Sequence, residues 1–393
     1  MHSYQTKLMT FLGASMLAGA VQAASDNLLG PMGGFREKVN LEMVYTGEYG
    51  KNTGGIEDDS TYLDNLDITM TFNDAFGQEG ATFFVYFLYN AGDGPSDAIG
   101  DAQGASNIDA PTTSKFYELW YETGIGTDNS VKVGLYDLNS EFDAIETAGL
   151  FLNSSHGIGP DYAQSGVNGP SIFPTTSFGA RLDFNLGDGY FFRFAVLDGV
   201  SGDPDDHHGT HIKFESDDGW LIPLEGGYVA GEPGTAEYMK WALGSWYYTE
   251  PLAFDVNGNA ISDSNNQGFY ALVEYGFTEN VAGYFRYGMA DEELNEVGSY
   301  IGAGVVYSGL FDSADNQLGL SVAIANVSDD VIDAVEAAGG SIEDNETVIE
   351  LSYRTVINPW LAIQPDIQWI KSPGFDPTLD DATLYSVRFE LTL

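Results

Sequence analysis

Hydrophobic and polar residues alternate with a period of two along most of the chain. From Thr383 to Leu393 every second side chain falls on one face, which includes Val387 and Phe389, and the other face includes Arg388 and Glu390. Successive side chains of a strand point to opposite faces, so this pattern predicts a half-buried strand. The chain ends on that strand. We expect it to close against the first strand of a barrel.

Similar segments of about ten alternating residues recur through the sequence. In the predicted second strand, one face carries Tyr62, Leu66, Ile68, Met70 and Phe72, and the other carries Asn65, Asp67, Thr69 and Thr71. Further examples begin at Phe178, Phe269 and Ile363. One face suits lipid and the other suits water, as a membrane barrel requires. A soluble β-sandwich also alternates, so this pattern alone leaves that alternative open.

The connections between these segments alternate between short and long. The short ones are Asn73–Glu79, Gly124–Asn129, Gly187–Asp188, Gly231–Ala236, Thr278–Asn280, Gly309–Asp315 and Val356–Trp360. The long ones are Gly50–Ser60, Ala91–Ser114, Asn139–Thr176, Gly199–Gly219, Thr249–Asn266, Ala290–Val297, Asn326–Asn345 and Ser372–Ala382. Membrane barrels have short periplasmic turns and long external loops, whereas a sandwich has no reason to follow this rule.

Seventeen segments alternate, and an odd number of strands would leave the N- and C-termini of the chain on opposite sides of the membrane. The weakest segment is His208–Glu215, which we interpret as one arm of a hairpin within an external loop. The prediction is therefore an all-β fold, a 16-stranded antiparallel transmembrane β-barrel. A barrel of this size encloses an aqueous lumen.

The N-terminus has the features of an export signal. Lys7 precedes a largely apolar run from Leu8 to Val21, and Val21-Gln22-Ala23 matches a small-residue cleavage site. We expect residues 1–23 to be a signal peptide and residues 24–393 to form the barrel domain in the bacterial outer membrane. No other apolar run approaches the ~20 residues that a spanning helix needs.

Composition narrows the possible functions. The chain has 59 acidic and 14 basic residues and no cysteine. This charge repels nucleic acid, and thiol chemistry is excluded. Ser155 and His156 are adjacent but lack a nucleophile turn, and the acidic spacing from Asp255 to Asp263 lacks the glycine and closing glutamate of a calcium loop. We expect no enzyme activity, no metal and no cofactor.

Seven basic residues fall at positions that face the lumen, namely Lys132, Arg181, Arg193, Lys240, Arg286, Arg354 and Arg388. A cation facing lipid at mid-membrane would cost ~2–4 kcal/mol, so these positions are expected. One interpretation is that they brace the wall by pairing with inward carboxylates. The other is that some rim a constriction and bind a permeating solute. The candidate pore-lining residues are Arg181, Arg193, Asp183, Glu118, Trp120, Lys132, Tyr136, Arg286, Arg354 and Glu350.

Three stretches of the sequence are distinctive: KVGLYDLNSEFD at 132–143, LFLNSSHGIGPDYAQSGVNGPSIFPTTSFGARL at 150–182, and INPWLAIQPDIQWIKSPG at 357–374. In these stretches the chain resembles the carbohydrate-selective porins of the OprB family. The resemblance implies a sixteen-stranded barrel and passive uptake of neutral sugars across the outer membrane. It also implies that the longest loop, Asn139–Thr176, folds inward and narrows the pore.

The leading hypothesis is therefore a porin for small neutral carbohydrates. One alternative is a general cation-preferring porin, which the acidity favours, and another is a surface adhesin or lectin-like β-protein. The expected partners are sugars, outer-membrane lipids and the barrel-assembly machinery, which would bind the C-terminal strand. We expect a monomer or a homotrimer.

Overall fold

The computed structural model describes residues 38–313 and 315–392. The predicted signal peptide, residues 1–23, lies outside this range. Within it, no helix is long and apolar enough to cross a membrane.

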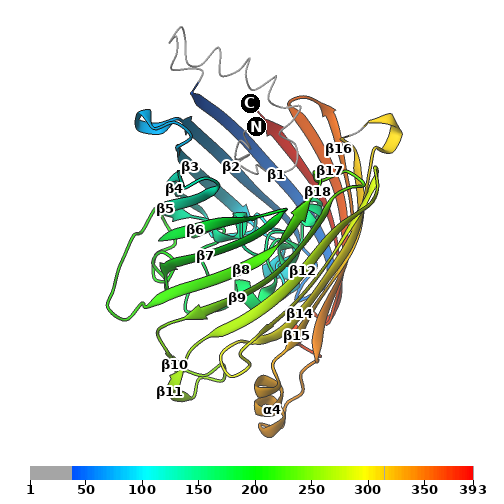
Figure 1. Cartoon of the computed structure of the whole chain (residues 1–393). Coiled ribbons are helices and arrows are strands. Elements are labelled where there is room, and N and C mark those ends of the chain that lie inside the picture. The colour runs from blue at the N-terminus through cyan, green and yellow to red at the C-terminus, as the bar shows by residue number, and fades with distance from the viewer. Residues whose placement is uncertain (1–37, 314, 393) are drawn as a thin grey trace.

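Sixteen of the strands in the described part of the chain form one closed antiparallel barrel (Figure 1). They are β1 (Val39–Gly55), β2 (Ser60–Asn73), β3 (Thr82–Asp93), β4 (Thr113–Ile125), β5 (Asn129–Tyr136), β6 (Ser177–Gly187), β7 (Tyr190–Asp198), β8 (Trp220–Ala230), β9 (Met239–Tyr248), β12 (Gln267–Thr278), β13 (Val281–Ala290), β14 (Val297–Ser308), β15 (Gln317–Val327), β16 (Asn345–Asn358), β17 (Leu361–Lys371) and β18 (Asp380–Thr392). The predicted fold class is confirmed.

The barrel closes between its first and last strands. Tyr45 lies opposite Leu391, Gly47 opposite Phe389 and Glu48 opposite Arg388 in the β1–β18 ladder. From Val44 to Gly55, the edge of β1 that would otherwise be open to lipid is therefore paired with β18.

The alternation of side chains along the strands matches the two sides of the wall. On β18, Tyr385 is 53% exposed on the outer face, whereas the neighbouring Leu384 and Ser386 are buried. The same phase holds on β12, where Phe269 and Tyr275 face outward and Tyr270 and Glu274 inward. Residue spacing alone thus predicted which side chains enter the barrel.

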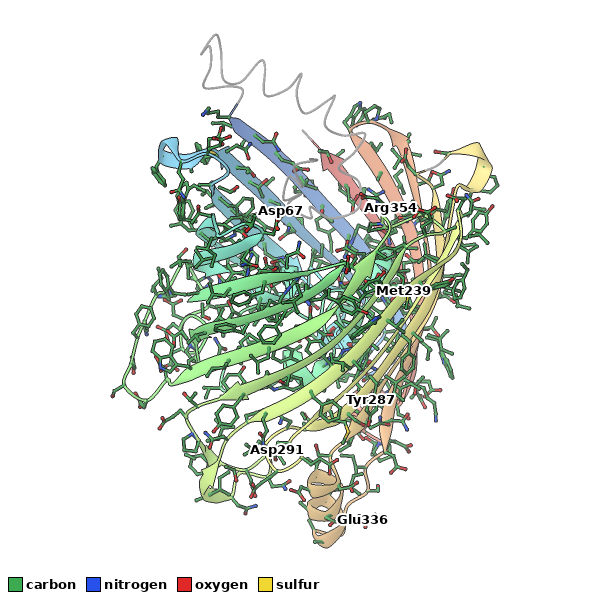
Figure 2. All side chains as sticks on the ribbon, viewed as in Figure 1. Asp67, Met239, Tyr287, Asp291, Glu336 and Arg354 are labelled. Atoms are coloured by element: carbon green, nitrogen blue, oxygen red, sulfur yellow. The ribbon has the colours of Figure 1, made fainter. Side chains whose placement is uncertain are left out.

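Short turns and long loops occupy opposite ends of the barrel (Figure 1). Asp291 and Glu336 lie toward the end that carries the long loops, and Asp67 and Arg354 lie toward the other (Figure 2). The shorter elements are α2 (Ser96–Ile99), α3 (Pro160–Ala163), α4 (Asp329–Ala337), η2 (Ala75–Gly77), η3 (Leu138–Ser140), η4 (Glu146–Leu150), η5 (Ser154–His156), η6 (Leu310–Asp312) and η7 (Pro373–Phe375). A separate hairpin, β10 (Leu252–Phe254) with β11 (Ala260–Ser264), projects from the long-loop end.

Two predictions about the loops are wrong. The connection after β1 spans only residues 56–59, because Lys51 pairs with both Ser60 and Tyr385 and the strand continues to Gly55. His208–Glu215 forms no strand and hence no hairpin arm. Its backbone has no partner strand, and the segment instead runs past β4.

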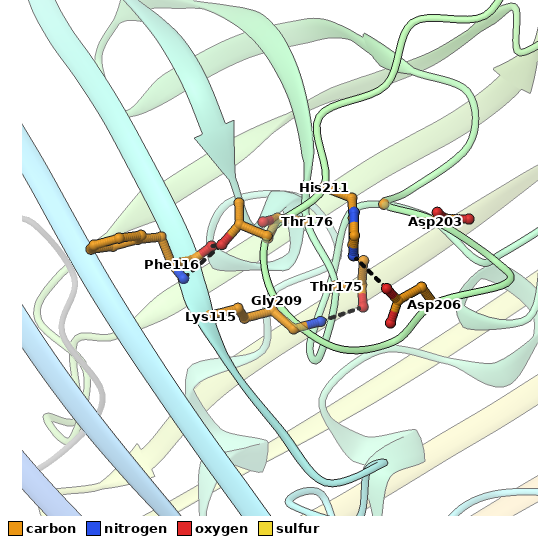
Figure 3. A pocket seen from close by; sticks show the side chains of 10 residues that line it. Lys115, Phe116, Thr175, Thr176, Asp203, Asp206, Gly209 and His211 are labelled. Atoms are coloured by element: carbon orange, nitrogen blue, oxygen red, sulfur yellow. Dashed lines mark hydrogen bonds and ion pairs between the residues drawn. The ribbon is translucent and has the colours of Figure 1, made fainter.

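The loop that contains this segment, residues 199–219, covers an edge of β4. Strand β5 ends at Tyr136, and the hydroxyl of Thr210 bonds both the backbone N–H and the C=O of Phe116. Beside them, Lys115 donates to Thr175 at 3.2 Å (Figure 3). The pocket there has a volume of about 10 Å³, too small for a sugar.

The long connection between β5 and β6 lies inside the barrel and contributes to a hydrophobic core. Phe142, Ile158 and Tyr162 of this loop pack with Trp246 and Tyr270 of the wall. The rings of Tyr162 and Trp246 stack with centroids 4.2 Å apart. One side of the interior is therefore filled with side chains, and the open space lies on the other side.

Candidate channel constriction

The barrel encloses a cavity of about 2540 Å³ with a mixed polar and apolar lining. Its lining comes mainly from β1 to β7, from β16 to β18 and from two loops that enter the barrel, residues 94–112 and 137–176. We call these the short inner loop and the long inner loop.

Inward acidic side chains of the wall hold the backbone of the long inner loop. Glu274 accepts the N–H of Thr147 at 2.7 Å, and Glu350 accepts the N–H of Leu152 at 2.5 Å. Both carboxylates are fully buried. A loop inside a barrel has no ladder partners, so buried side chains satisfy the donors that water would otherwise bind.

Arg286 of β13 binds two separate parts of the same loop. Its Nη2 lies 2.7 Å from Asp143 and its Nη1 lies 2.5 Å from Asp161. All three side chains are almost wholly buried. Because both carboxylates are charge-assisted acceptors of one planar guanidinium, Arg286 fixes the two parts relative to each other.

The short inner loop also enters the barrel, which the sequence analysis did not predict. Glu346 of β16 accepts the backbone N–H groups of Ala102 and Gln103 at 2.8 and 3.1 Å. Asn107 then donates its backbone N–H to the carbonyl of Leu152 on the long inner loop at 2.7 Å. The only sequence signal was the length of this segment, since Glu346 lies 243 residues from Gln103.

A charged cluster occupies the wall from β4 to β6. The strand register places Lys132 opposite both Glu122 and Arg181. Two cations that face each other across strands repel. Glu141 of the long inner loop relieves this repulsion, because its carboxylate lies 3.0 Å from Lys132 and 2.7 Å from the Nε of Arg181.

Glu141 is ionised in this cluster. Burial raises the pKa of its carboxyl group, but the charges of Lys132 and Arg181 outweigh that effect, and the pKa falls below its ordinary value. Arg181 is only 2% exposed and also bonds Glu122 at 2.9 Å and Ser130 at 2.6 Å. Its nitrogens are therefore already occupied by protein partners.

Arg193 of β7 is more open. Its side chain is 19% exposed and borders the cavity, and its guanidinium lies over the ring of Phe191 at 4.6 Å. Nη1 donates to the carbonyl of Glu141 at 2.8 Å. Nε lies 3.1 Å from Asp183 but forms no aligned hydrogen bond within the described structure.

An aromatic pair adjoins the cluster. Trp120 stacks on Phe84 with ring centroids 4.9 Å apart, and its indole N–H donates to Glu118 at 3.0 Å. The ammonium of Lys132 lies 4.4 Å from the Trp120 ring. On another part of the cavity wall, Arg354 of β16 pairs with Glu390 of β18 at 2.5 Å.

Seven of the ten candidate residues line the cavity: Arg181, Arg193, Asp183, Glu118, Trp120, Lys132 and Arg354. The other three, Tyr136, Arg286 and Glu350, do not. They face inward as predicted, but they are buried. The long inner loop covers Arg286 and Glu350 by direct contact, and Tyr136 lies in the hydrophobic core to which that loop contributes. Alternation predicts the face of a strand and gives no information about what covers that face.

A closed barrel of sixteen antiparallel strands, with an apolar outer face and a charged cavity inside, defines a porin. It is an integral channel protein of the outer membrane. Residues 57–393 match the family described as "Carbohydrate-selective porin, OprB family", and the chain belongs to this family.

Individual relatives agree over nearly the full length. Porin B of Pseudomonas aeruginosa is 23% identical, with 96% of this chain and 94% of that protein covered. The high-pH structure of Pseudomonas putida OprB is 20% identical, with a TM-score of 0.78 and coverage of 93% and 97%. The anion-selective porin from Comamonas acidovorans is 12% identical, with a TM-score of 0.52 and coverage of 90% and 99%.

Proposed function

We propose that this porin mediates passive diffusion of small neutral sugars, and that the permeating sugar binds beside Arg193 and Glu141. The observation that carries the proposal is the cluster of three basic side chains around Glu141 at the cavity wall. Lys132 and Arg181 bond its carboxylate, and Arg193 bonds its main-chain carbonyl. Paired opposite charges supply donors and acceptors for hydroxyl groups without selecting the sign of an ion.

The proposed site must be weak, because a channel has to release what it binds. Many of the polar groups already have protein partners, so a sugar would exchange a few bonds rather than gain many. A millimolar dissociation constant corresponds to about −4 kcal/mol, which two or three such bonds can supply.

We further propose that residues 139–176 narrow the pore. The contacts of Glu274, Glu350 and Arg286 support this role, because they hold the segment inside the barrel. The space that stays open is lined mainly by β1–β7 and β16–β18. The remaining proposals are that residues 1–23 are cleaved on export and that the barrel-assembly machinery binds β18. A monomer or a homotrimer is the proposed assembly.

Conductance through single reconstituted channels tests the function. We expect glucose, added in millimolar steps, to reduce the ion current in a saturable way, whereas a non-carbohydrate solute of similar size and no charge should reduce it only through viscosity. Equal, non-saturating effects of both solutes would contradict the proposal.

The second candidate function, a cation-preferring porin, has its own support. Among the residues that the structure describes, fifteen acidic and five basic residues line the cavity. A reversal potential that favours cations together with saturable sugar block supports a sugar porin with a cation-attracting lumen. Cation preference without block supports the second candidate alone.

A further inference from the structure

Asp143, on the long inner loop, has an unusual backbone conformation. Its φ is +52°, in the left-handed region that side chains other than glycine rarely adopt. Such conformations persist where the surrounding structure determines them, and they cluster at functional sites. Asp143 is fully buried, and its side chain disfavours this conformation, which a glycine at the same position would adopt without strain.

The surroundings of Asp143 hold both its backbone and its side chain. Its N–H lies 2.9 Å from the carboxylate of Glu225 and 2.9 Å from the hydroxyl of Tyr270. Its carboxylate accepts Nε of Arg286 at 3.0 Å and Nη2 at 2.7 Å. Three strands, β8, β12 and β13, therefore converge on one residue of the loop.

The consequence lies two residues earlier in the chain, at Glu141. The segment 137–143 is held at its start, where the N–H of Asp137 donates to Glu118 at 3.1 Å, and at its end by the bonds of Asp143. Glu141 stands between these two fixed points and receives Lys132 and Arg181. Of the two fixed points, Asp143 is the nearer to Glu141, so we expect its loss to shift the Glu141 carboxylate away from its cations.

We infer that Asp143, held in a left-handed conformation by Arg286, is the positioning residue that places Glu141 in the constriction. This inference rests on the proposed function for its sugar readout. It also predicts an effect on ion selectivity, which is independent of sugar.

Asp161 provides a matched control. It binds the same guanidinium, is equally buried, and has no positive φ. Removing either carboxylate leaves Arg286 with a single partner, so the two losses are equal in charge. Only the loss of Asp143 acts on the segment that carries Glu141.

The experiment compares D143A with D161A in reconstituted channels, after heat-modifiable migration shows that each barrel has folded. We expect D143A to weaken block by glucose at least fivefold. It should also lower cation preference, because Lys132 and Arg181 lose their neutralising carboxylate. D161A should match the wild type in both measurements, even if both variants lose similar thermal stability.

Equal effects of D143A and D161A on block and selectivity, or no effect of D143A, would overturn the inference. If the alanine variants do not fold, D143N and D161N replace them, with an expected loss of block of at least twofold for D143N alone. If the wild type shows no sugar block, the proposed function fails, and the change in ion selectivity still decides the role of Asp143.

Discussion

Replacing Arg193 by alanine separates a sugar-binding role from a structural one. Arg181 and Arg193 both line the cavity, but the Arg193 side chain is 19% exposed, whereas Arg181 is buried among protein partners. A hydrogen bond to a charged group contributes about 1.5–3 kcal/mol. Loss of one such bond to a sugar, taken at about 1.5 kcal/mol, should weaken block roughly tenfold.

The stability cost of R193A should be small by comparison. Its ion pair with Asp183 joins two partly exposed side chains, and pairs of this kind contribute about 0–1 kcal/mol. R181A should behave in the opposite way. It leaves Glu122 and Glu141 short of a cation in a buried site, a change that typically costs about 3–5 kcal/mol.

The assay measures glucose block of single-channel current and the melting temperature of the same detergent-solubilised variants. R193A should lose block and keep most of its stability, and R181A should lose more stability. R193K serves as the matched control, since it keeps the charge without the planar fork. If glucose blocks R193A as strongly as the wild type and the melting temperature falls sharply, the reasoning is refuted, and the role of Arg193 is to stabilise the barrel wall.

Three further predictions concern topology, assembly and pH. An impermeant thiol reagent on intact cells should label a single cysteine that replaces Asn257, in the β10–β11 hairpin, but not one that replaces Gly234. The opposite pattern would show that the barrel has the reverse orientation in the membrane. Deleting Phe389–Leu393 removes the β18 partners of Val44 to Gly47 in the ladder that closes the barrel, and it should abolish heat-modifiable migration. Folded truncated protein at normal levels would contradict closure through β18. The pKa of Glu141 is lower in the folded protein than its ordinary value, so its ionised carboxylate stabilises the fold at neutral pH. This stabilisation should be lost only as the pH falls below about 4. Melting temperatures measured over this pH range should show the loss in the wild type and not in E141Q.

Much of the architecture follows from local pattern. Lys132, Arg181 and Arg354 face the cavity as their positions in the alternation predict, because lipid on one side and water on the other allow only one phase for a charged side chain. Strand count and loop alternation were equally local. The structure of the segment at His208–Glu215 and the length of the first connection were misjudged, since both depend on neighbouring strands.

The interior was decided by tertiary structure. Arg286 and Glu350 occupy inward positions like those of Arg181, but the long inner loop covers them, and the short inner loop enters because Glu346 accepts its backbone N–H groups. These contacts join residues more than a hundred positions apart, so no periodicity in the sequence encodes them. Alternation follows from the two-residue repeat of a strand, which is a local property of the backbone and does not depend on distant residues. The coverage of an inward face depends on which distant segment finds hydrogen-bond partners there.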